Sequence, residues 1–247
     1  MSTTERRVLA VIPARGGSKG LPGKNLAELA GVPLLAHAVR FAASVPEITR
    51  CVVSTDDDEI AAVAGAYGAD VPFRRPAELA SDDTPMAPVL RHALAAVDSD
   101  AEPVDLVVLL TPTNPVRSAS DVSAAIARLD TSDVDGIVSV SEPHFHPVFV
   151  GVRSGDGDLV TRYFDDGTGL TRRQDTDRFL RINGQFYVWR ADFVRRLQRS
   201  WLDEGRHLGF ETDDFVAADV DTPADLERLR ALAAAGIVHL APIDPLF

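Results

Sequence analysis

Short apolar runs alternate with longer segments of helical period along most of the chain. The predicted strands are runs rich in Val, Ile and Leu, at residues 8–12, 50–55, 104–110, 136–141, 185–189 and 215–218. In the predicted helices apolar residues recur every three or four positions, at residues 34–44, 58–67, 86–97, 119–129, 191–199 and 223–235. Strands that alternate with helices in this way predict a mainly parallel sheet covered by helices.

Two of the predicted strands indicate that helices cover both faces of the sheet. The runs CVVS at residues 51–54 and VVLL at residues 107–110 have apolar residues at consecutive positions, so both of their faces must be buried. We therefore expect an α/β fold with a doubly wound, mainly parallel sheet. A length of 247 residues suits a single domain spanning residues 1–247.

The alternation stops between residues 142 and 182. This segment mixes aromatic residues, glycines and charges without a helical period. A loop of this length inside one domain is either functional or an embedded lobe. The strand-like stretches VFVGV and LVTRYF flank SGDGD, which predicts a hairpin extending from the main sheet.

Composition narrows the class of protein. The sequence is 45% apolar and 25% charged, as in ordinary globular proteins. A net charge of −12 makes nucleic acid an unfavourable partner. One cysteine, Cys51, allows neither an intrachain disulfide nor a multi-cysteine metal site. No apolar run approaches the ~20 residues that span a bilayer, and the N-terminus has no secretory signal, so we expect a cytoplasmic protein without a membrane partner.

A loop rich in glycines and cations follows the first predicted strand. Glycines let a backbone approach a ligand closely and turn successive N–H groups toward an anion. This loop combines four glycines with three cations: Gly16, Gly17, Gly20, Gly23, Arg15, Lys19 and Lys24. Asn25 after Lys24 excludes a Walker A loop, which needs Ser or Thr there. The loop predicts a polyphosphate site; the alternatives are an ordinary βα turn and, for Lys19, a solvated side chain.

Asp219-Val220-Asp221 is the second candidate site. Alternate residues of an extended segment point to the same face, so the two carboxylates can share one ligand. Carboxylates together with phosphate oxygens suit Mg²⁺. The alternative is that Asp221 helps to cap the helix that begins after Thr222.

Several motifs of the sequence resemble those of the CMP-sialic acid synthetases (acylneuraminate cytidylyltransferases). They lie in the family's order and span nearly the whole chain: IPARGGSKGLPGKN, STDDDEIA, RPAELASD, PTNPVR, RQ…NGQFY and DVDTPADL. The resemblance implies a fold like that of nucleotide-diphospho-sugar transferases, with residues 142–182 as a dimerisation lobe that reaches into the partner's active site. It also implies a homodimer that uses CTP.

The resemblance assigns roles on the nucleotide side. It implies that Arg15 and Lys24 contact the triphosphate, that Arg75 contacts cytosine, and that Asp219 and Asp221 hold the catalytic Mg²⁺. The other residues expected around the nucleotide are Gly16, Gly17, Ser18, Asn25 and Thr84. A surface salt bridge is the alternative for Arg75. Met86 stands where the family often has a serine near the base, so that contact does not carry over.

The acceptor side departs from the family. Thr111 replaces a glutamine that touches sialic acid, and Phe149 aligns with a lysine that arrives from the neighbouring subunit. Arg173, Asn183 and Tyr187 are kept. A polar site that loses its partners discriminates sharply against the old substrate. We therefore expect poor use of N-acetylneuraminate itself.

The sequence as a whole predicts a Mg²⁺-dependent nucleotidyltransferase that moves CMP from CTP to an acidic sugar, either a sialic acid or a related nonulosonic or 2-keto-3-deoxy sugar acid, and releases pyrophosphate. A cytidylyltransferase for a phosphonate or another acidic metabolite is one alternative. A metal-dependent glycosyltransferase and a non-catalytic nucleotide-binding module are the others. Asp56 is a further candidate near the nucleotide, with Asp57 as a helix cap, and His146-Pro147 is read as the family's HP turn rather than as part of a metal site.

Overall fold

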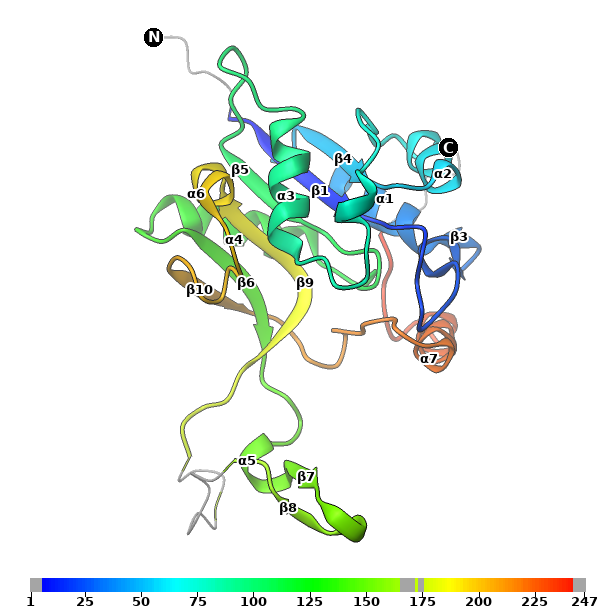
Figure 1. Ribbon diagram of the computed structural model, residues 1–247, viewed down its shortest axis with the longest axis vertical. Coiled ribbons are helices and arrows are strands. Elements are labelled where there is room, and N and C mark those ends of the chain that lie inside the picture. The colour runs from blue at the N-terminus through cyan, green and yellow to red at the C-terminus, as the bar shows by residue number, and fades with distance from the viewer. Residues whose placement is uncertain (1–5, 165–171, 173–175, 242–247) are drawn as a thin grey trace.

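A six-stranded mixed sheet forms the centre of the protein. The computed structural model describes residues 6–164, 172 and 176–241. The strands lie in the order β10 (His207–Glu211), β6 (Gly136–Ser141), β9 (Arg181–Arg190), β5 (Leu106–Leu109), β1 (Val8–Pro13) and β4 (Arg50–Ser54). Only β9 runs antiparallel to its neighbours β5 and β6, so the expected mainly parallel sheet is confirmed (Figure 1).

Helices cover both faces of this sheet. One face packs against α1 (Leu34–Ser44), α2 (Asp58–Ala66) and α4 (Ala119–Asp130), and the other against α3 (Met86–Ala95) and α6 (Ala191–Arg196). Along β1, Val8, Ala10 and Ile12 join the first core and Leu9 and Val11 the second, as the period of two in a strand requires. The doubly wound arrangement is therefore confirmed.

A third, smaller core lies beside the sheet. Here α7 (Pro223–Ala234) packs against the short hairpin of β2 (Glu28–Leu29) and β3 (Val32–Pro33), which follows the 3₁₀ turn η1 (Lys24–Leu26). Leu226 and Leu229 of α7 share this core with Leu29 and with Val220. Packing of α7 thus fixes the segment that precedes it in the sequence.

One predicted strand was wrong. Residues 215–218 do not form a strand, and the edge of the sheet is instead β10, which pairs in parallel with β6. The sequence of β10, HLGFE, carries a glycine and two polar ends and is only partly buried, so its local pattern is weak. Pairing with β6 determines this strand, and such pairing is a long-range interaction that periodicity does not reveal.

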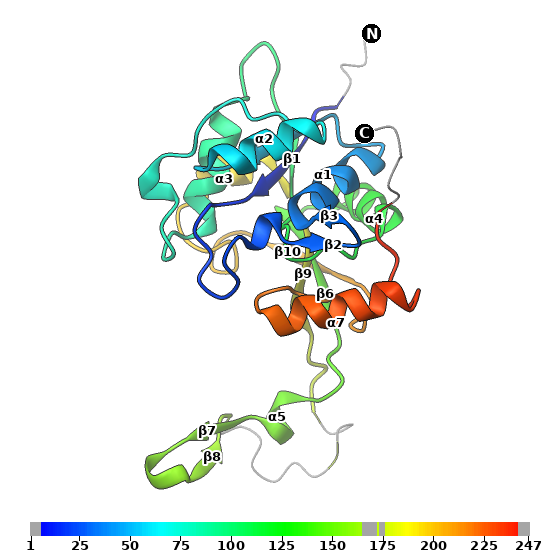
Figure 2. The ribbon, with the colours of Figure 1, turned by 90° about the vertical axis from the view of Figure 1, so that its right-hand side faces the viewer.

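The segment between β6 and β9 projects away from the sheet (Figures 1 and 2). It contains α5 (Pro147–Val150), β7 (Val152–Ser154), the 3₁₀ turn η3 (Asp156–Asp158) and β8 (Val160–Arg162). The hairpin of β7 and β8 is confirmed, but it is a separate two-stranded sheet and not an extension of the main one. The first predicted strand, VFVGV, is mostly α5, because Pro147 suits a first helical position and His146 caps the helix.

The remaining short helix, η2 (Ala77–Leu79), lies between α2 and α3. Within the described ranges, no helix is both long enough and apolar enough to cross a membrane.

Candidate active site

The glycine-rich loop after β1 is held against neighbouring segments. The Asn25 side-chain amide donates to the carbonyl oxygen of Arg15 over 2.9 Å. The backbone N–H of Gly16 donates to the Asp56 carboxylate over 3.0 Å, which places Asp56 beside the loop. A Cβ atom on Gly20 would lie 2.6 Å from the backbone oxygen of Asp221, so only glycine allows the loop to pass this close.

Asp219 and Asp221 flank a buried valine. Val220 is fully buried, and its N–H donates to the carbonyl oxygen of Thr113 over 2.8 Å. Because alternate residues of an extended segment share a side, both carboxylates point away from the core. Both aspartates are exposed, as a site open to a ligand requires.

The cap of α7 is formed by other residues than Asp221. The Thr222 hydroxyl accepts from the N–H of Asp225 over 3.3 Å, and the Asp225 carboxylate accepts from the N–H of Thr222 over 2.8 Å. This reciprocal capping box satisfies the first turn of the helix. Thr222 and Asp225 therefore cap the helix, and the Asp221 carboxylate takes no part in this cap.

Lys24 joins the loop to the paired carboxylates. Its Nζ lies 2.8 Å from Oδ1 of Asp221, although the two residues are 197 positions apart in the sequence. The Lys24 side chain is mostly buried, with 17% of its surface exposed. Tertiary structure thus brings the two sequence motifs, the cationic loop and the Asp-Val-Asp segment, into direct contact.

Asp219 has a perturbed acidity. Although the residue is exposed, protein atoms around its carboxylate withhold part of its hydration, and this raises the pKa of Asp219. A hydrogen bond from the Thr113 side chain opposes the shift, whereas the charge of Asp221 adds to it. Two carboxylates that repel each other gain from a shared cation, so this pair suits a metal site.

A cavity of about 590 Å³ lies between the loop, the Asp-Val-Asp segment and the start of α3. Lys24 and Asp221 lie on its wall, together with Arg75, whose guanidinium is buried. The other predicted nucleotide residues that line this cavity are Arg15, Ser18, Asn25 and Thr84. Gly16 and Gly17 belong to the same loop but do not line the cavity. Met86 lines it, at the position where the family has a serine.

Arg75 is not a surface salt-bridge residue. Its Nε donates to the Ser54 hydroxyl over 3.0 Å, and its Nη2 donates to the Ser54 carbonyl oxygen. Burial lowers the pKa of Arg75, and the charge of Asp56 partly opposes this shift. The end of β4 thus holds this cation in the wall of the cavity.

Arg15 and Lys19 share one carboxylate, that of Asp82. Arg15 Nη2 lies 2.5 Å from Oδ1, and Lys19 Nζ lies 2.5 Å from Oδ2. Asp82 lies in the segment between η2 and α3 and lines the same cavity. Two of the three cations of the loop therefore form ion pairs with Asp82, and the third, Lys24, pairs with Asp221.

The predicted acceptor residues do not form one group. Thr111 lines the 590 Å³ cavity, and its buried hydroxyl has no hydrogen-bond partner in the described part of the chain. Asn183 is buried and donates to the Thr212 hydroxyl over 2.7 Å. Tyr187 is stacked on Trp189 of the same strand, with ring centroids 5.2 Å apart. Phe149 lies in α5, away from the sheet (Figure 1), and Arg173 is outside the described residues.

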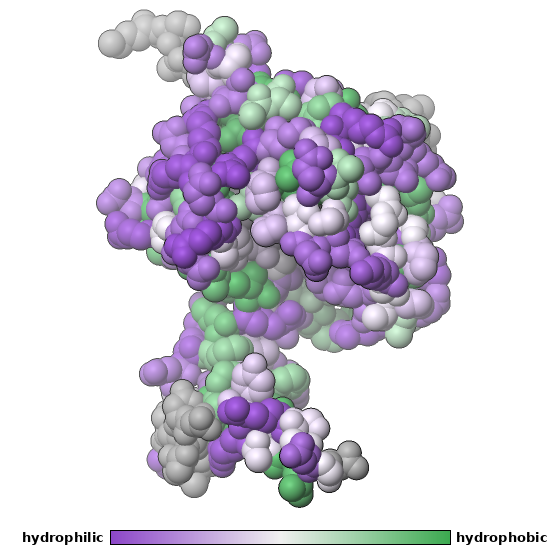
Figure 3. All heavy atoms as spheres, viewed as in Figure 1, coloured by the Kyte–Doolittle hydropathy of each residue, from purple (hydrophilic) through white to green (hydrophobic). Residues whose placement is uncertain are grey.

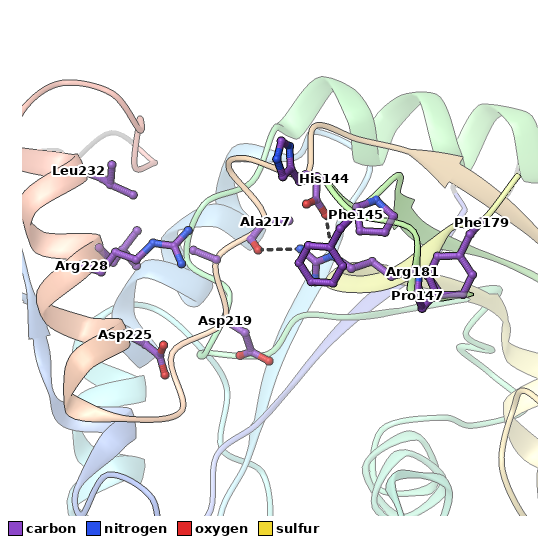
Figure 4. Close-up of a pocket in the computed structure, with 14 residues that line it drawn as sticks. His144, Phe145, Pro147, Phe179, Arg181, Ala217, Asp219, Asp225, Arg228 and Leu232 are labelled. Carbon is purple, nitrogen blue, oxygen red and sulfur yellow. Dashed lines mark hydrogen bonds and ion pairs between the residues drawn. The ribbon is translucent and has the colours of Figure 1, made fainter. Parts of the chain in front are cut away.

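A second cavity, of about 470 Å³, is lined by Asp219, which does not line the first one. Figure 4 shows Arg228 and Leu232 of α7 on one side of it, and Arg181, Phe145 and Phe179 on the other. Arg181 Nε donates to the Asp214 carboxylate over 2.6 Å, and its Nη2 donates to the carbonyl oxygen of Ala217 over 3.3 Å. The sequence analysis did not single out these residues, because they belong to four separate segments and match no motif.

Arg117, the last residue of the PTNPVR motif, is a further residue that the sequence analysis did not use. It is half-buried and donates to the carbonyl oxygens of Thr111, after β5, and Gln185, in β9. Burial lowers the pKa of Arg117 to about 9, and the charge of Asp219 opposes this shift. Arg117 therefore ties the backbone after β5 to β9, and thereby positions Thr111.

Asp219 and Asp221 are the residues here that fit Mg²⁺, because they supply hard oxygen ligands on one side of an extended segment. Among the described residues, no group of three or more His, Cys, Asp and Glu side chains could hold a metal by itself. His144 lines the second cavity, and His146 caps α5, so the His-x-His pair forms no such group. A cation at Asp219 and Asp221 would need further oxygens from a ligand, as Mg²⁺ bound with phosphates usually has.

Comparison with known proteins supports a nucleotide-transferring enzyme. A model of the family described as "Cytidylyltransferase" matches residues 9–166. The CMP-N,N'-diacetyllegionaminic acid synthase of Legionella pneumophila is 34% identical over 238 residues, a match that covers 94% of this chain and 100% of that protein. The pseudaminic acid cytidylyltransferase of Campylobacter jejuni is 28% identical over 229 residues, with 91% and 95% covered.

A solved structure shares the fold. The CMP:2-keto-3-deoxy-manno-octonic acid synthetase complexed with CTP superposes with a TM-score of 0.71 at 22% identity, over 93% of this chain and 99% of that one. The family model covers well over half of the chain, and the relatives match almost its full length. The chain therefore belongs to the cytidylyltransferase family and is one of its members that are similar to the CMP-sialic acid synthetases.

Proposed function

We propose that this protein is a Mg²⁺-dependent cytidylyltransferase that transfers CMP from CTP to an acidic sugar of the nonulosonic or 2-keto-3-deoxy class. The observation that carries the proposal is the contact between Lys24 and Asp221. It joins the cationic glycine loop to the Asp-Val-Asp segment, whose Asp221 lines the same cavity as the loop and whose Asp219 lines the second cavity. Nucleotidyl transfer requires this combination, because the phosphates must be positioned and their developing charge stabilised.

The 590 Å³ cavity has room for the nucleotide. Arg15 and Lys19, which both pair with Asp82 at this cavity, would bind the terminal phosphates, and Lys24, which pairs with Asp221, would bind beside the metal site. Arg75 and Thr84, which line the same cavity, would bind the base. Cytosine offers two acceptors, O2 and N3, which suit an arginine.

Asp219 and Asp221 would hold the Mg²⁺. When bound there, the metal supplies positive charge to the phosphate oxygens and thereby favours attack on the α-phosphorus. Lys24 contributes a second positive charge at the same place, since it lies 2.8 Å from Asp221. Asp221 in turn fixes the direction of the Lys24 ammonium group.

The reaction is an in-line displacement. An oxygen of the acceptor hydroxyl forms a bond to the α-phosphorus, and the bond from that phosphorus to the oxygen bridging the α- and β-phosphates breaks. Pyrophosphate leaves with this bridging oxygen, and the acceptor hydroxyl gives its proton to solvent water. We assign no protein side chain as the general base.

The second cavity is the place that we propose for the acceptor. An attacking hydroxyl must lie beside the α-phosphate, and this cavity is lined by Asp219. Arg228 offers a cation for the acceptor's carboxylate, and Phe145, Phe179 and Leu232 offer apolar surface for acyl or methyl groups. This lining favours an acylated sugar acid with a weakly polar end. Thr111 and Phe149 do not line this cavity in one chain, and the expected poor use of N-acetylneuraminate rests on their departure from the family.

We also propose that the lobe joins two copies of the chain. Figure 3 shows hydrophobic residues on the stalk of the lobe and at its tip. Large apolar side chains with more than half of their surface exposed lie in this segment: Phe145, Val150, Val152, Leu159, Val160 and Tyr163. Exposed apolar surface of this kind on a projecting hairpin favours a protein partner, and a second copy fits the homodimer expected from the resemblance.

An assay of pyrophosphate release from CTP tests the function. The panel contains N,N'-diacetyllegionaminic acid, pseudaminic acid, 2-keto-3-deoxy-manno-octonic acid, N-acetylneuraminate and a set of phosphonates. We expect turnover with a nonulosonic acid and Mg²⁺, with N-acetylneuraminate among the poor acceptors. Turnover with a phosphonate alone would favour the alternative acceptor class. Binding of CTP without turnover of any acceptor would contradict the proposal.

A further inference from the structure

We propose that Asp82 competes with the pyrophosphate product for Arg15 and Lys19 and thereby promotes its release. This inference rests on the proposed function, in which these two cations bind the terminal phosphates of CTP. Asp82 acts through Arg15 and Lys19, so it is a positioning residue for them.

The geometry of the three side chains resembles that of a bound phosphate. Asp82 places one carboxylate oxygen on each cation, Oδ1 at 2.5 Å from Arg15 and Oδ2 at 2.5 Å from Lys19. Two oxygens of a phosphate group would occupy the same positions against these donors. Because all three residues line one cavity, a polyphosphate that enters it meets cations that are already paired.

The ion pairs are of a kind that a ligand can exchange. Lys19 has 85% of its side chain exposed, whereas Arg15 and Asp82 have 29% and 30%. Ion pairs in contact with solvent contribute little stability, so they yield readily to a more highly charged anion. The hydrogen bond from Lys19 and the nearby charge of Arg15 keep the pKa of Asp82 low, so its carboxylate remains ionised and remains a competitor at neutral pH.

Competition by Asp82 should weaken the binding of pyrophosphate more than the binding of CTP. CTP also binds through its base and through the region of Lys24 and Asp221, whereas pyrophosphate keeps only phosphate contacts once the bond to the α-phosphorus has broken. A carboxylate that reclaims Arg15 and Lys19 therefore shortens the stay of pyrophosphate while CTP retains its other contacts. Product release is the rate-limiting step in many enzymes, so a residue that speeds the release of pyrophosphate can raise turnover.

Calorimetric titration of the full-length protein with inorganic pyrophosphate and Mg²⁺ tests this inference. Asp82→Asn should bind pyrophosphate about 3- to 10-fold more tightly, the range expected when two solvent-accessible ion pairs no longer compete. Product inhibition by pyrophosphate should strengthen by the same factor. The gain should shrink as salt concentration rises, because salt screens exposed pairs; a purely structural effect of the substitution would not show this dependence.

Two variants serve as controls. Asp82→Glu keeps the charge and should behave like the wild type. Asp83→Asn removes the same charge from the next residue, which is exposed and makes neither ion pair, and it should leave pyrophosphate affinity unchanged. Unchanged or weaker binding in Asp82→Asn, or equal tightening in Asp83→Asn, would overturn the inference. Either result leaves the proposed function intact if the wild type still releases pyrophosphate from CTP.

Discussion

At the scale of single residues, Asp219 and Asp221 differ although one position separates them. Asp221 is paired with Lys24, whereas Asp219 accepts from Thr113 and has a raised pKa. If both hold Mg²⁺, Asp219→Asn and Asp221→Asn should each lower the turnover of CTP by about 10²-fold or more, since each removes charge stabilisation in the transition state. Chelation of Mg²⁺ should abolish pyrophosphate release while the circular dichroism spectrum is unchanged.

The loss of activity in Asp219→Asn should not be accompanied by a loss of stability. A raised pKa means that folded Asp219 holds its proton more tightly than unfolded Asp219 does, so ionisation lowers stability as pH rises through the raised value. Asp219→Asn should therefore keep or raise Tm at pH 7. Ser118→Ala is the matched control: it weakens the cap of α4, which is not adjacent to the site, and should lower Tm more than turnover. Full activity in Asp221→Asn would remove that residue from the metal site.

Replacement of Lys24 and replacement of Arg75 should change different kinetic constants. Lys24→Ala should lower the rate of CTP turnover by at least about 10²-fold, because it removes a charge beside the reacting phosphate. Arg75→Ala should instead raise the KM for CTP and weaken the preference for CTP over UTP. Arg74→Ala is the control, since Arg74 is exposed and pairs with Asp58 outside the cavity. Wild-type kinetics in both Lys24→Ala and Arg75→Ala would place the nucleotide elsewhere.

At the scale of elements, the N-terminal cap of α7 stabilises the fold and lies next to Asp221 of the candidate site. Thr222 caps the helix directly after Asp221, and Leu226 and Leu229 anchor it in the third core. Thr222→Ala should destabilise the protein by about 1 kcal/mol, measured by urea unfolding. It should also lower kcat more than Ser118→Ala does, because the equivalent cap of α4 is not adjacent to a carboxylate of the site. Equal effects on kcat would show that the α7 cap has no influence on Asp221.

At the scale of the whole molecule, the lobe should matter for the acceptor more than for CTP. Val160→Asp places a charge on the exposed apolar face of β8 and should give a monomer by light scattering, with Thr161→Asp on the same strand as control. The monomer should lose affinity for the acceptor while the KM for CTP changes little, because Phe149 would act from the partner subunit. A Val160→Asp dimer, or equal loss for both substrates, would contradict this role.

The identity of the acceptor is also tested at this scale. Loss of a buried charge-assisted contact costs ~1.5–3 kcal/mol, so the two departures from the family could lower efficiency with N-acetylneuraminate by ~10²–10⁴-fold. Thr111→Gln together with Phe149→Lys should shift preference toward N-acetylneuraminate in the substrate panel. Efficient turnover of N-acetylneuraminate by the wild type would show that these two positions do not set the specificity.

Local patterns determined the elements that carry strong local signals. The helices begin where the sequence places caps such as Asp57, Ser118 and Thr222, and α1 has the predicted bounds. The strands β1, β4 and β5 were predicted because consecutive apolar residues make up most of each one. The edge strand β10 was not, because its stability comes from pairing with β6 and not from its own composition.

The sequence by itself determined the fold class, the family and the two motifs of the candidate site, because each depends on residues that are close together in the chain. Only the tertiary structure decided that Lys24 meets Asp221 and that Asp82 pairs with Arg15 and Lys19. It alone also assembled the second cavity beside Asp219. Contacts between distant segments arise from the packing of strands and of α7, and a one-dimensional pattern carries no record of which side chains that packing brings together.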